Sequence, residues 1–262
     1  MAQKIYQVDA FTREAFSGNP AAVCPLDHWL SDAVLQNIAM ENNLSETAFY
    51  VKDGSSYRLR WFTPVTEVDL CGHATLASAY VLFNLEGHTG NKITFLSDRS
   101  GILTVAREGD LLTLDFPADG IRKAEMNDII RTGFNILPEK VFMGKTDYLL
   151  VYRNEKEILD LAPDFGRISE LDCRGIIVTA KGDSADFVSR FFGPQSGINE
   201  DPVTGSAHTT LTPYWSERLG RKEMDALQLS QRRGYLHCTM NGERVGISGR
   251  CRLYLTGHLT GI

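Results

Sequence analysis

The chain has 262 residues, of which 43% are hydrophobic and 23% charged, and these values are ordinary for a globular protein of one large or two average domains. Its formal net charge of −6 disfavours a nucleic-acid partner, because phosphate binding requires a basic surface. No apolar run approaches the roughly 20 residues that cross a bilayer, so we expect no membrane partner.

The first half of the chain is predicted to alternate short strands with two helices. An N-terminal strand leads to a turn at Ser17–Pro20. Ser31 is the expected N-cap of a helix whose apolar residues recur along one face. A second, more apolar helix is expected over residues 75–85. Alternating or β-branched patterns predict strands at residues 47–51, 57–62, 93–96, 102–105 and 111–116.

The same order of elements recurs after the segment Pro117–Gly120, which is therefore the expected boundary between residues 1–117 and 118–262. The closing strand, which includes Tyr254 and Leu255, could instead join the first half. A helix is expected over residues 207–219, and Pro213 should kink it locally because proline removes an interior hydrogen bond. Further elements are predicted at residues 126–134 (helix), 148–152, 175–178 and 186–191 (strands). The fold class is α+β, with two similar halves that each contain one central helix.

One short pattern occurs in both halves, as Leu70–Thr75 and as Val203–His208. Each copy places a glycine, Gly72 or Gly205, where an extended segment is followed by a predicted helix. Glycine allows close approach of the backbone to a ligand, and the first N–H groups of a helix have no partner inside it. Such donors, at the positive end of the helix dipole, bind anions. Two copies predict a cleft between the halves that binds a carboxylate or an enolate-like oxygen.

Two residues of the first half are candidates for acid–base chemistry. Glu46 lies among small and apolar neighbours, where desolvation disfavours the charged carboxylate and brings its titration toward the operating pH. The alternative is a solvated glutamate in a turn. His73 follows Gly72, and the helix dipole is expected to lower its pKa, so that it acts as a neutral donor or proton relay. The alternative is a capping or packed histidine.

Two residues of the second half are candidates for substrate binding. Asp201 lies just before the second junction, where negative charge is favoured, and Ser206 follows Gly205. The alternative for both is a structural role in capping the loop or the helix.

Cys71 is a rival to Glu46 as the base. A thiol just before a helix is expected to have a lowered pKa and to accept protons. The equivalent residue in the second copy is Thr204, so a racemase that uses two cysteines would lack one of its bases.

The sequence does not contain the complete motifs of several other kinds of site. Gly144–Thr146 resembles the end of a phosphate-binding loop, but Glu139 stands where the first glycine is required. The histidines show no metal-ligand spacing and there is no dinucleotide-binding glycine motif, so we expect no metal and no cofactor. The five cysteines form no CxxC pair, and no secretory signal is visible, which predicts reduced thiols and a cytoplasmic location.

Over nearly its whole length the chain resembles the phenazine-biosynthesis PhzF-like isomerase family, which has the diaminopimelate-epimerase-like fold. The motifs that carry the resemblance are Asp9–Thr12, Phe16–Val23, Asn43–Phe49, Arg60–Pro64, Glu67–Thr75, Arg190–Pro194 and Gly197–His208. The resemblance implies two domains, each a curled, mostly antiparallel sheet around a central helix, with the active site between them, and a homodimer. It implies that Glu46 is the catalytic residue and that His73, Asp201 and Ser206 contact substrate. Arg233 departs from the pattern, because relatives often carry glycine there, and this leaves the substrate open.

The leading hypothesis is a cofactor-independent isomerase that moves a proton within a small, anionic, carboxylate-bearing metabolite. Glu46 would be the general acid/base, and the N–H groups near Gly72 and Gly205 would stabilise the developing negative charge. One alternative is an amino-acid racemase or epimerase that uses Cys71. Another is a non-catalytic protein that binds a small molecule in the same cleft.

Overall fold

The computed structural model describes residues 3–261. Contacts within the chain divide it into two compact units, unit 1 (Met1–Asp115 with Ser248–Ile262) and unit 2 (Phe116–Ile247). Unit 1 therefore includes the closing strand as well as the first half of the chain. Among residues 3–261, no helix combines the length and the apolarity that crossing a bilayer requires.

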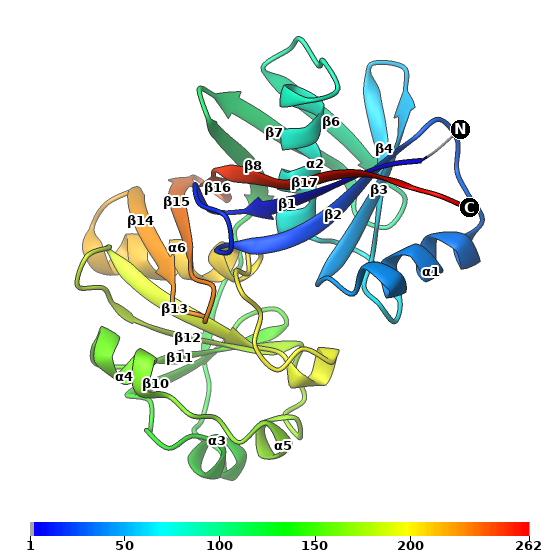
Figure 1. Cartoon of the computed structure of the whole chain (residues 1–262). Helices are drawn as coiled ribbons and strands as arrows, with labels where there is room; N and C mark the ends of the chain where they lie inside the picture. Colours follow the sequence, from blue (N-terminus) through cyan, green and yellow to red (C-terminus); the bar gives the residue numbers. More distant parts are fainter. Residues whose placement is uncertain (1–2, 262) are drawn as a thin grey trace. The chain divides into compact units, whose positions relative to one another are not determined.

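Unit 1 is a mostly antiparallel sheet curled around one helix (Figure 1). Its strands pair in the order β17-β1-β2-β3-β4-β6-β7-β8, and the pairs β2–β3 and β4–β6 are parallel. A short strand, β5, pairs with β4. The strands are β1 (Gln3–Ala10), β2 (Asn19–Leu26), β3 (Glu46–Asp53), β4 (Ser56–Phe62), β5 (Glu67–Val68), β6 (Lys92–Ser97), β7 (Gly101–Glu108), β8 (Leu111–Pro117) and β17 (Cys251–Leu259).

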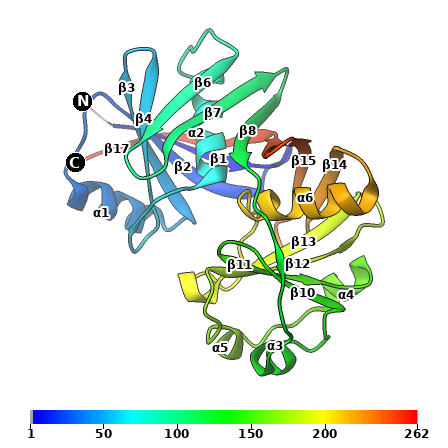
Figure 2. The same ribbon diagram turned by 180° about the vertical axis from the view of Figure 1, so that it is seen from behind.

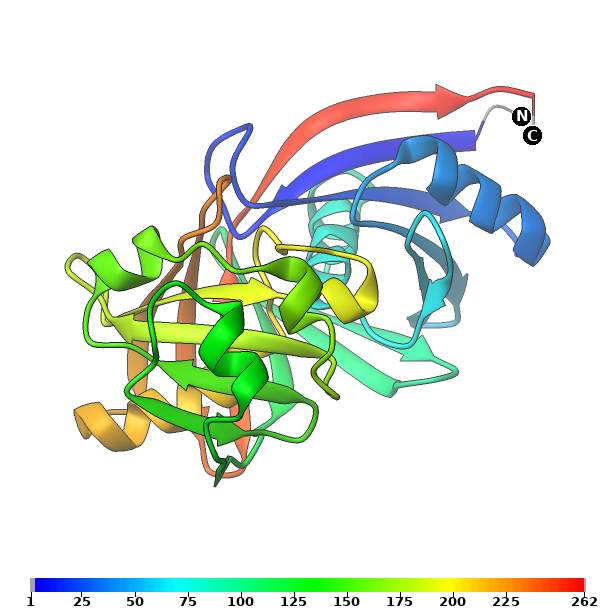
Figure 3. The same ribbon diagram turned by 90° about the horizontal axis from the view of Figure 1, so that it is seen from below.

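The helix inside this curl is α2 (Gly72–Asn84), and it contacts β1, β2, β3 and β17. Figure 3 shows it enclosed between β1 and β2 on one side and the β6–β7 hairpin on the other. Its buried residues extend almost all round the helix, which explains why the sequence is apolar without a clear polar face. The helix begins three residues earlier than expected, at Gly72 rather than Thr75, because the junction itself forms the first turn. The other helix, α1 (Asp32–Asn42), packs on β3 and β4.

Unit 2 repeats this connectivity. Its sheet pairs in the order β9-β10-β11-β12-β13-β14-β15, and again two pairs are parallel, β11–β12 and β13–β14. As in unit 1, the second parallel pair is joined by the central helix, here α6 (Ala207–Leu219). The strands are β9 (Arg122–Lys123), β10 (Lys140–Met143), β11 (Asp147–Val151), β12 (Gly175–Lys181), β13 (Phe187–Phe192), β14 (Glu223–Gln228), β15 (Gly234–Asn241) and β16 (Arg244–Gly249). The repeat confirms the α+β fold with two similar halves.

Helices cover both faces of the sheet in unit 2. Figure 2 shows α6 on one face and α3 with α5 on the other. The second face holds an apolar core of isoleucines, leucines and phenylalanines contributed by the strands and the short helices. These helices are α3 (Asp128–Gly133), α4 (Glu155–Asp160), α5 (Phe165–Ile168) and the 3₁₀ turn η1 (Pro194–Ser196). The sequence predicted α3 but neither α4 nor α5, because four to six residues show little periodicity.

The proline inside α6 leaves one carbonyl without its helical donor, and the chain supplies another. Pro213 cannot donate to the carbonyl of Thr209, and the N–H of Asp119 donates to that oxygen at 3.0 Å. The Asp119 carboxylate also accepts from Thr210 Oγ1 at 2.9 Å. The segment that was expected to be the boundary between the halves is therefore hydrogen-bonded to the central helix of unit 2.

Candidate functional site

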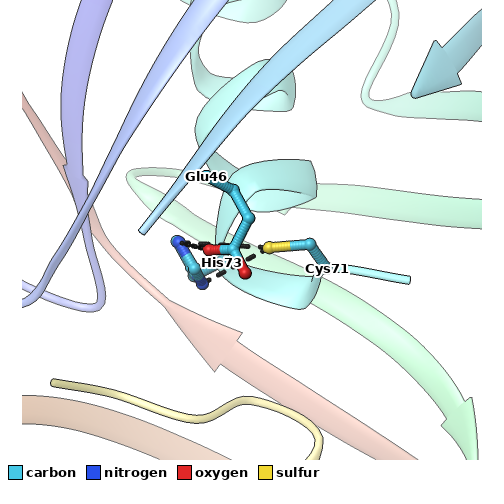
Figure 4. A group of neighbouring side chains, drawn as sticks. All are labelled: Glu46, Cys71 and His73. Atoms are coloured by element: carbon cyan, nitrogen blue, oxygen red, sulfur yellow. Dashed lines mark hydrogen bonds and ion pairs between the residues drawn. The ribbon is translucent and has the colours of Figure 1, made fainter. Parts of the chain in front are cut away.

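Three chemically reactive side chains of unit 1 converge where β3 begins and α2 begins. Glu46 is the first residue of β3, Cys71 precedes α2, and His73 is the second residue of that helix. Figure 4 shows the three side chains pointing toward one another. The sequence pattern already placed Gly72 and His73 at a helix start. The parallel pairing of β3 with β2 brings Glu46 to the same place.

The three groups lie within hydrogen-bonding or ion-pair distance. Nε2 of His73 is 3.1 Å from Oε2 of Glu46, and Nδ1 is 3.5 Å from Sγ of Cys71. The side chains of His73 and Glu46 are 7% and 13% exposed, so neither faces bulk solvent. Asn19, at the start of β2, adds a fourth group, because its Nδ2 lies 3.2 Å from Nδ1 of His73. The sequence analysis missed Asn19, because the only local sign of a role was that a polar residue lies beside the start of a strand.

The expected pKa of His73 is wrong in direction. Burial and the helix dipole both disfavour an imidazolium, but the Cys71 sulfur and the Glu46 carboxylate raise the pKa of His73 well above its usual value. Cys71 and a carboxylate at 3.1 Å together outweigh the effect of burial. His73 is therefore a cation held against Glu46 and not the neutral donor that the sequence suggested.

The expected pKa of Cys71 is also wrong in direction. Burial and the nearby Glu46 carboxylate raise the pKa of the Cys71 thiol to about 11. This raised pKa weakens the alternative in which Cys71 is the base. Glu46, Cys71 and His73 offer three ligand atoms within 4.8 Å of one another, a set that suits a soft divalent cation. Such binding would first have to displace the protons of the thiol and the imidazolium.

The second junction is a hydrogen-bonded loop in unit 2. Thr204 Oγ1 donates to Oδ2 of Asp201 at 2.5 Å, and the Thr204 N–H donates to Gln228 Oε1 at 2.8 Å. The Gln228 amide in turn donates to the Asp201 carbonyl at 2.8 Å. These bonds hold the backbone of Gly205 and Ser206 in place, and within residues 3–261 their N–H groups have no acceptor. Two adjacent free donors at a helix start can bind an anion.

An arginine that the sequence analysis missed adds positive charge to this loop. Arg174 Nη1 donates to Ser206 Oγ at 2.9 Å, and its Nε donates to the buried Asp147 carboxylate at 2.9 Å. Burial would lower the pKa of Arg174, but the hydrogen bond with Asp147 raises it. The side chain is still 41% exposed, so the guanidinium can also contact a ligand. Of the predicted residues, the structure therefore brings Glu46 to Gly72 and His73 in unit 1, and Asp201 to Gly205 and Ser206 in unit 2.

Comparison with known proteins agrees with the fold. Residues 8–258 match the family model described as phenazine biosynthesis-like protein. An uncharacterized isomerase of Pseudomonas aeruginosa is 54% identical over 259 residues, which cover 99% of each chain. The crystal structure of a phenazine biosynthesis PhzF family protein from Enterococcus faecalis superposes with a TM-score of 0.96 at 47% identity, over 98% of this chain and 99% of that one.

The chain belongs to the phenazine biosynthesis-like family. This confirms the expected family. The fold is also found in more distant proteins. A probable proline racemase from Agrobacterium radiobacter matches with a TM-score of 0.67 over 98% of this chain at 6% identity, which shows a shared fold and nothing about chemistry.

The residue that departs from the family pattern, Arg233, occupies a left-handed backbone conformation with φ of 56°. Glycine adopts this conformation without strain, whereas an arginine adopts it less readily. The N–H of Arg233 donates to Ser230 Oγ at 3.2 Å, and that hydroxyl donates to the Pro202 carbonyl at 2.6 Å. Two hydrogen bonds, through Ser230, therefore connect Arg233 to the loop that contains Asp201.

Proposed function

We propose that the chain is an isomerase that moves a proton within a small carboxylate-bearing molecule, with Glu46 as the general acid/base. The relatives named isomerases support the reaction class. The observation that carries the residue assignment is the shielded position of Glu46 against His73. A carboxylate held in place by a buried cation, with only 13% of its side chain exposed, is suited to proton transfer without loss to bulk water.

In the proposed step the Glu46 carboxylate removes a proton from a carbon of the substrate. The electron pair left on that carbon delocalises onto the adjacent conjugated system and its oxygen. Glu46 then returns the proton to a different carbon, so the atoms and electrons balance and no co-reactant is consumed. Before the proton is removed, the ion pair with His73 restricts the Glu46 carboxylate to one position.

Unit 2 is proposed to bind the substrate's negative charge. The free N–H groups of Gly205 and Ser206 and the exposed face of the Arg174 guanidinium support this assignment, because all are donors for an oxyanion. Asp201 is proposed to accept from a polar group of the substrate. Its carboxylate is already oriented by Thr204, which fixes the geometry before binding.

The test is incorporation of solvent deuterium. The protein is incubated in heavy water with a mixture of small carboxylic-acid metabolites, and mass spectrometry identifies the compound that gains label or changes isomer. We expect Glu46→Gln to lower that rate by about 10²–10⁴, because it removes the base and keeps the shape of the side chain. The matched control is Glu41→Gln on the exposed face of α1, which should leave the rate unchanged.

Other outcomes distinguish the alternatives. Label at the α-carbon of an amino acid that is lost in Cys71→Ser but kept in Glu46→Gln would replace this proposal with a racemase. A tight ligand that is recovered unchanged and without label would indicate a non-catalytic binding protein. A homodimer remains part of the proposal, and sedimentation velocity tests it.

A further inference from the structure

A cavity in unit 1 lies apart from the Glu46 group, and most of its charged lining residues are arginines. It has a volume of about 400 Å³ and lies where the C-terminal half of α2, the β7–β8 turn and the start of β17 meet. Its charged lining residues are Arg13, Arg107, Arg250, Arg252 and Asp110. None of them belongs to the cluster of Glu46, Cys71, Asn19 and His73.

The charge of this lining is unusual for this chain. Four arginines face a single carboxylate, which leaves a net charge of +3, whereas the whole chain carries −6. Like charges collected in one cavity repel one another unless an anion is present, and the field that they create attracts one. The cavity is therefore positively charged, although the chain as a whole is negatively charged.

Two of the four arginines are held in place by the protein. Arg250 Nε donates to Oδ2 of Asp110 at 2.7 Å. The Arg107 guanidinium lies 4.4 Å from the ring centroid of Phe83 and donates to the Phe83 carbonyl at 3.4 Å. Neither contact involves all of the donors of a guanidinium, which has five. Both side chains are thus oriented and still able to bind a ligand.

The other two arginines are held less tightly, and Arg13 acts on Asp110 only by adding to the effect of Arg250, which lowers the pKa of that carboxyl. Arg13 and Arg252 are exposed, and within residues 3–261 neither forms an ion pair. The side chains of Tyr80 and Asn84, from α2, add polar groups to the same wall. Arginine's planar group matches the oxygens of phosphate and carboxylate in pairs, so a wall with four of them suits a ligand with more than one such group.

We propose that this cavity binds a small molecule that carries two or more phosphate or carboxylate groups. The volume is within the range of small-molecule sites and is too large for a single inorganic anion to fill. The site is separate from the proposed catalytic residues, although α2 connects the two. Tyr80 follows His73 by two helical turns, about 10 Å along the axis.

The experiment is isothermal titration of the full chain with inorganic pyrophosphate and, in a second arm, with citrate. Low ionic strength is used because salt screens exposed charges. We expect one site per chain. The tighter of the two probes identifies whether phosphate or carboxylate is the preferred chemistry.

The decisive variant is Arg13→Gln/Arg252→Gln, because neither side chain forms an ion pair that folding would lose. We expect it to weaken binding about 10-fold or more, since each charged donor that is removed costs an interaction of that order. The matched control is Arg131→Gln/Arg153→Gln on the exposed surface of unit 2, which removes the same charge and should leave the affinity unchanged. Asp110→Asn removes the only carboxylate of the lining and should tighten binding several-fold.

Three results with the probes and the lining variants would overturn the proposal, and a fourth comes from Glu46→Gln. The first three are no binding of either probe at millimolar concentration, an equal loss in both double variants, and weaker binding in Asp110→Asn. The Glu46→Gln protein should bind pyrophosphate as the wild type does, so the outcome is independent of the proposed isomerase activity. If Glu46→Gln alone abolishes binding, the probe occupies the catalytic group and the separate site is refuted.

Discussion

His73 and His208 are each the second residue of a central helix, His73 in α2 of unit 1 and His208 in α6 of unit 2. Both are buried, and both lie at the positive end of a helix dipole. Glu46 and Cys71 raise the pKa of His73 despite its burial, whereas burial lowers the pKa of His208 to about 4. The nearest partner of His208 is the Thr204 carbonyl, which is 2.9 Å from Nδ1 and carries no net charge.

The comparison shows that the repeated backbone does not determine the chemistry of a junction. Both units place a histidine at the same point of the fold, but only in unit 1 does a carboxylate from another strand face it. The first junction therefore holds a histidine–carboxylate pair, and the second combines a neutral histidine with free N–H donors and the Arg174 guanidinium. We propose that the first performs proton transfer and the second binds. The following experiments test that division.

The largest effect is expected from His73→Gln. Removal of the cation that orients Glu46 should lower the rate of deuterium incorporation by about 10²–10⁴. The exposed His28, changed to Gln, is the matched control and should have wild-type activity. If His73→Gln leaves the rate within a few-fold of wild type, then His73 is a packed core histidine and the proposed division is wrong.

His208 should make the protein less stable in acid. Its pKa is about 4 in the folded protein and near 6.5 in the unfolded chain, so between these values the unfolded chain binds more protons. The free energy of unfolding should thus fall by about 3 kcal/mol as the pH falls from 6.5 to 4. His73 acts in the opposite sense, because its raised pKa stabilises the fold at low pH and this contribution is lost as the pH rises through the raised value.

Urea denaturation of wild type and His208→Gln over this pH range separates the two histidines. In the variant, the free energy of unfolding should fall much less between pH 6.5 and pH 4, because glutamine does not titrate. An unchanged pH profile in the variant would assign the decline to other groups.

Arg174→Gln should weaken substrate binding. Hydrogen bonds to charged groups contribute about 1.5–3 kcal/mol, so KM should rise about 10-fold or more while kcat changes less. Arg167→Gln, which removes another arginine of unit 2, is the control. A fall in kcat at constant KM would instead place Arg174 in the chemical step.

The smallest effects are expected from substitutions at the starts of two helices. Ser31 is the N-cap residue of α1, as expected, but its side chain makes no capping hydrogen bond, whereas Asn127 accepts from the Ile130 N–H at 2.9 Å at the start of α3. Asn127→Ala should therefore cost about 1 kcal/mol of unfolding free energy, and Ser31→Ala only a few tenths. Equal losses in urea denaturation would show that Ser31 caps its helix in solution.

Local sequence was sufficient to predict the elements that have a strong hydrophobic periodicity or a clear terminus. The helix at residues 207–219 was predicted at both ends, and Gly220 ends it in the left-handed conformation with φ of 67°. The strands around it and the two glycine junctions were recognised because their patterns are complete within ten residues. The family was recognised because its motifs are long and occur in order along the chain, as the match over residues 8–258 confirms.

Only the tertiary structure decided the charge states and the supporting contacts of the site. Asn19 reaches His73 across 54 residues, and Arg174 reaches Ser206 across 32. The helix dipole is a property of the local chain, and it predicted a lowered pKa for His73. Electrostatic interactions depend on distance in space, so Cys71 and a carboxylate 3.1 Å away reversed that prediction, whereas at His208, for which the sequence made no prediction, burial lowers the pKa.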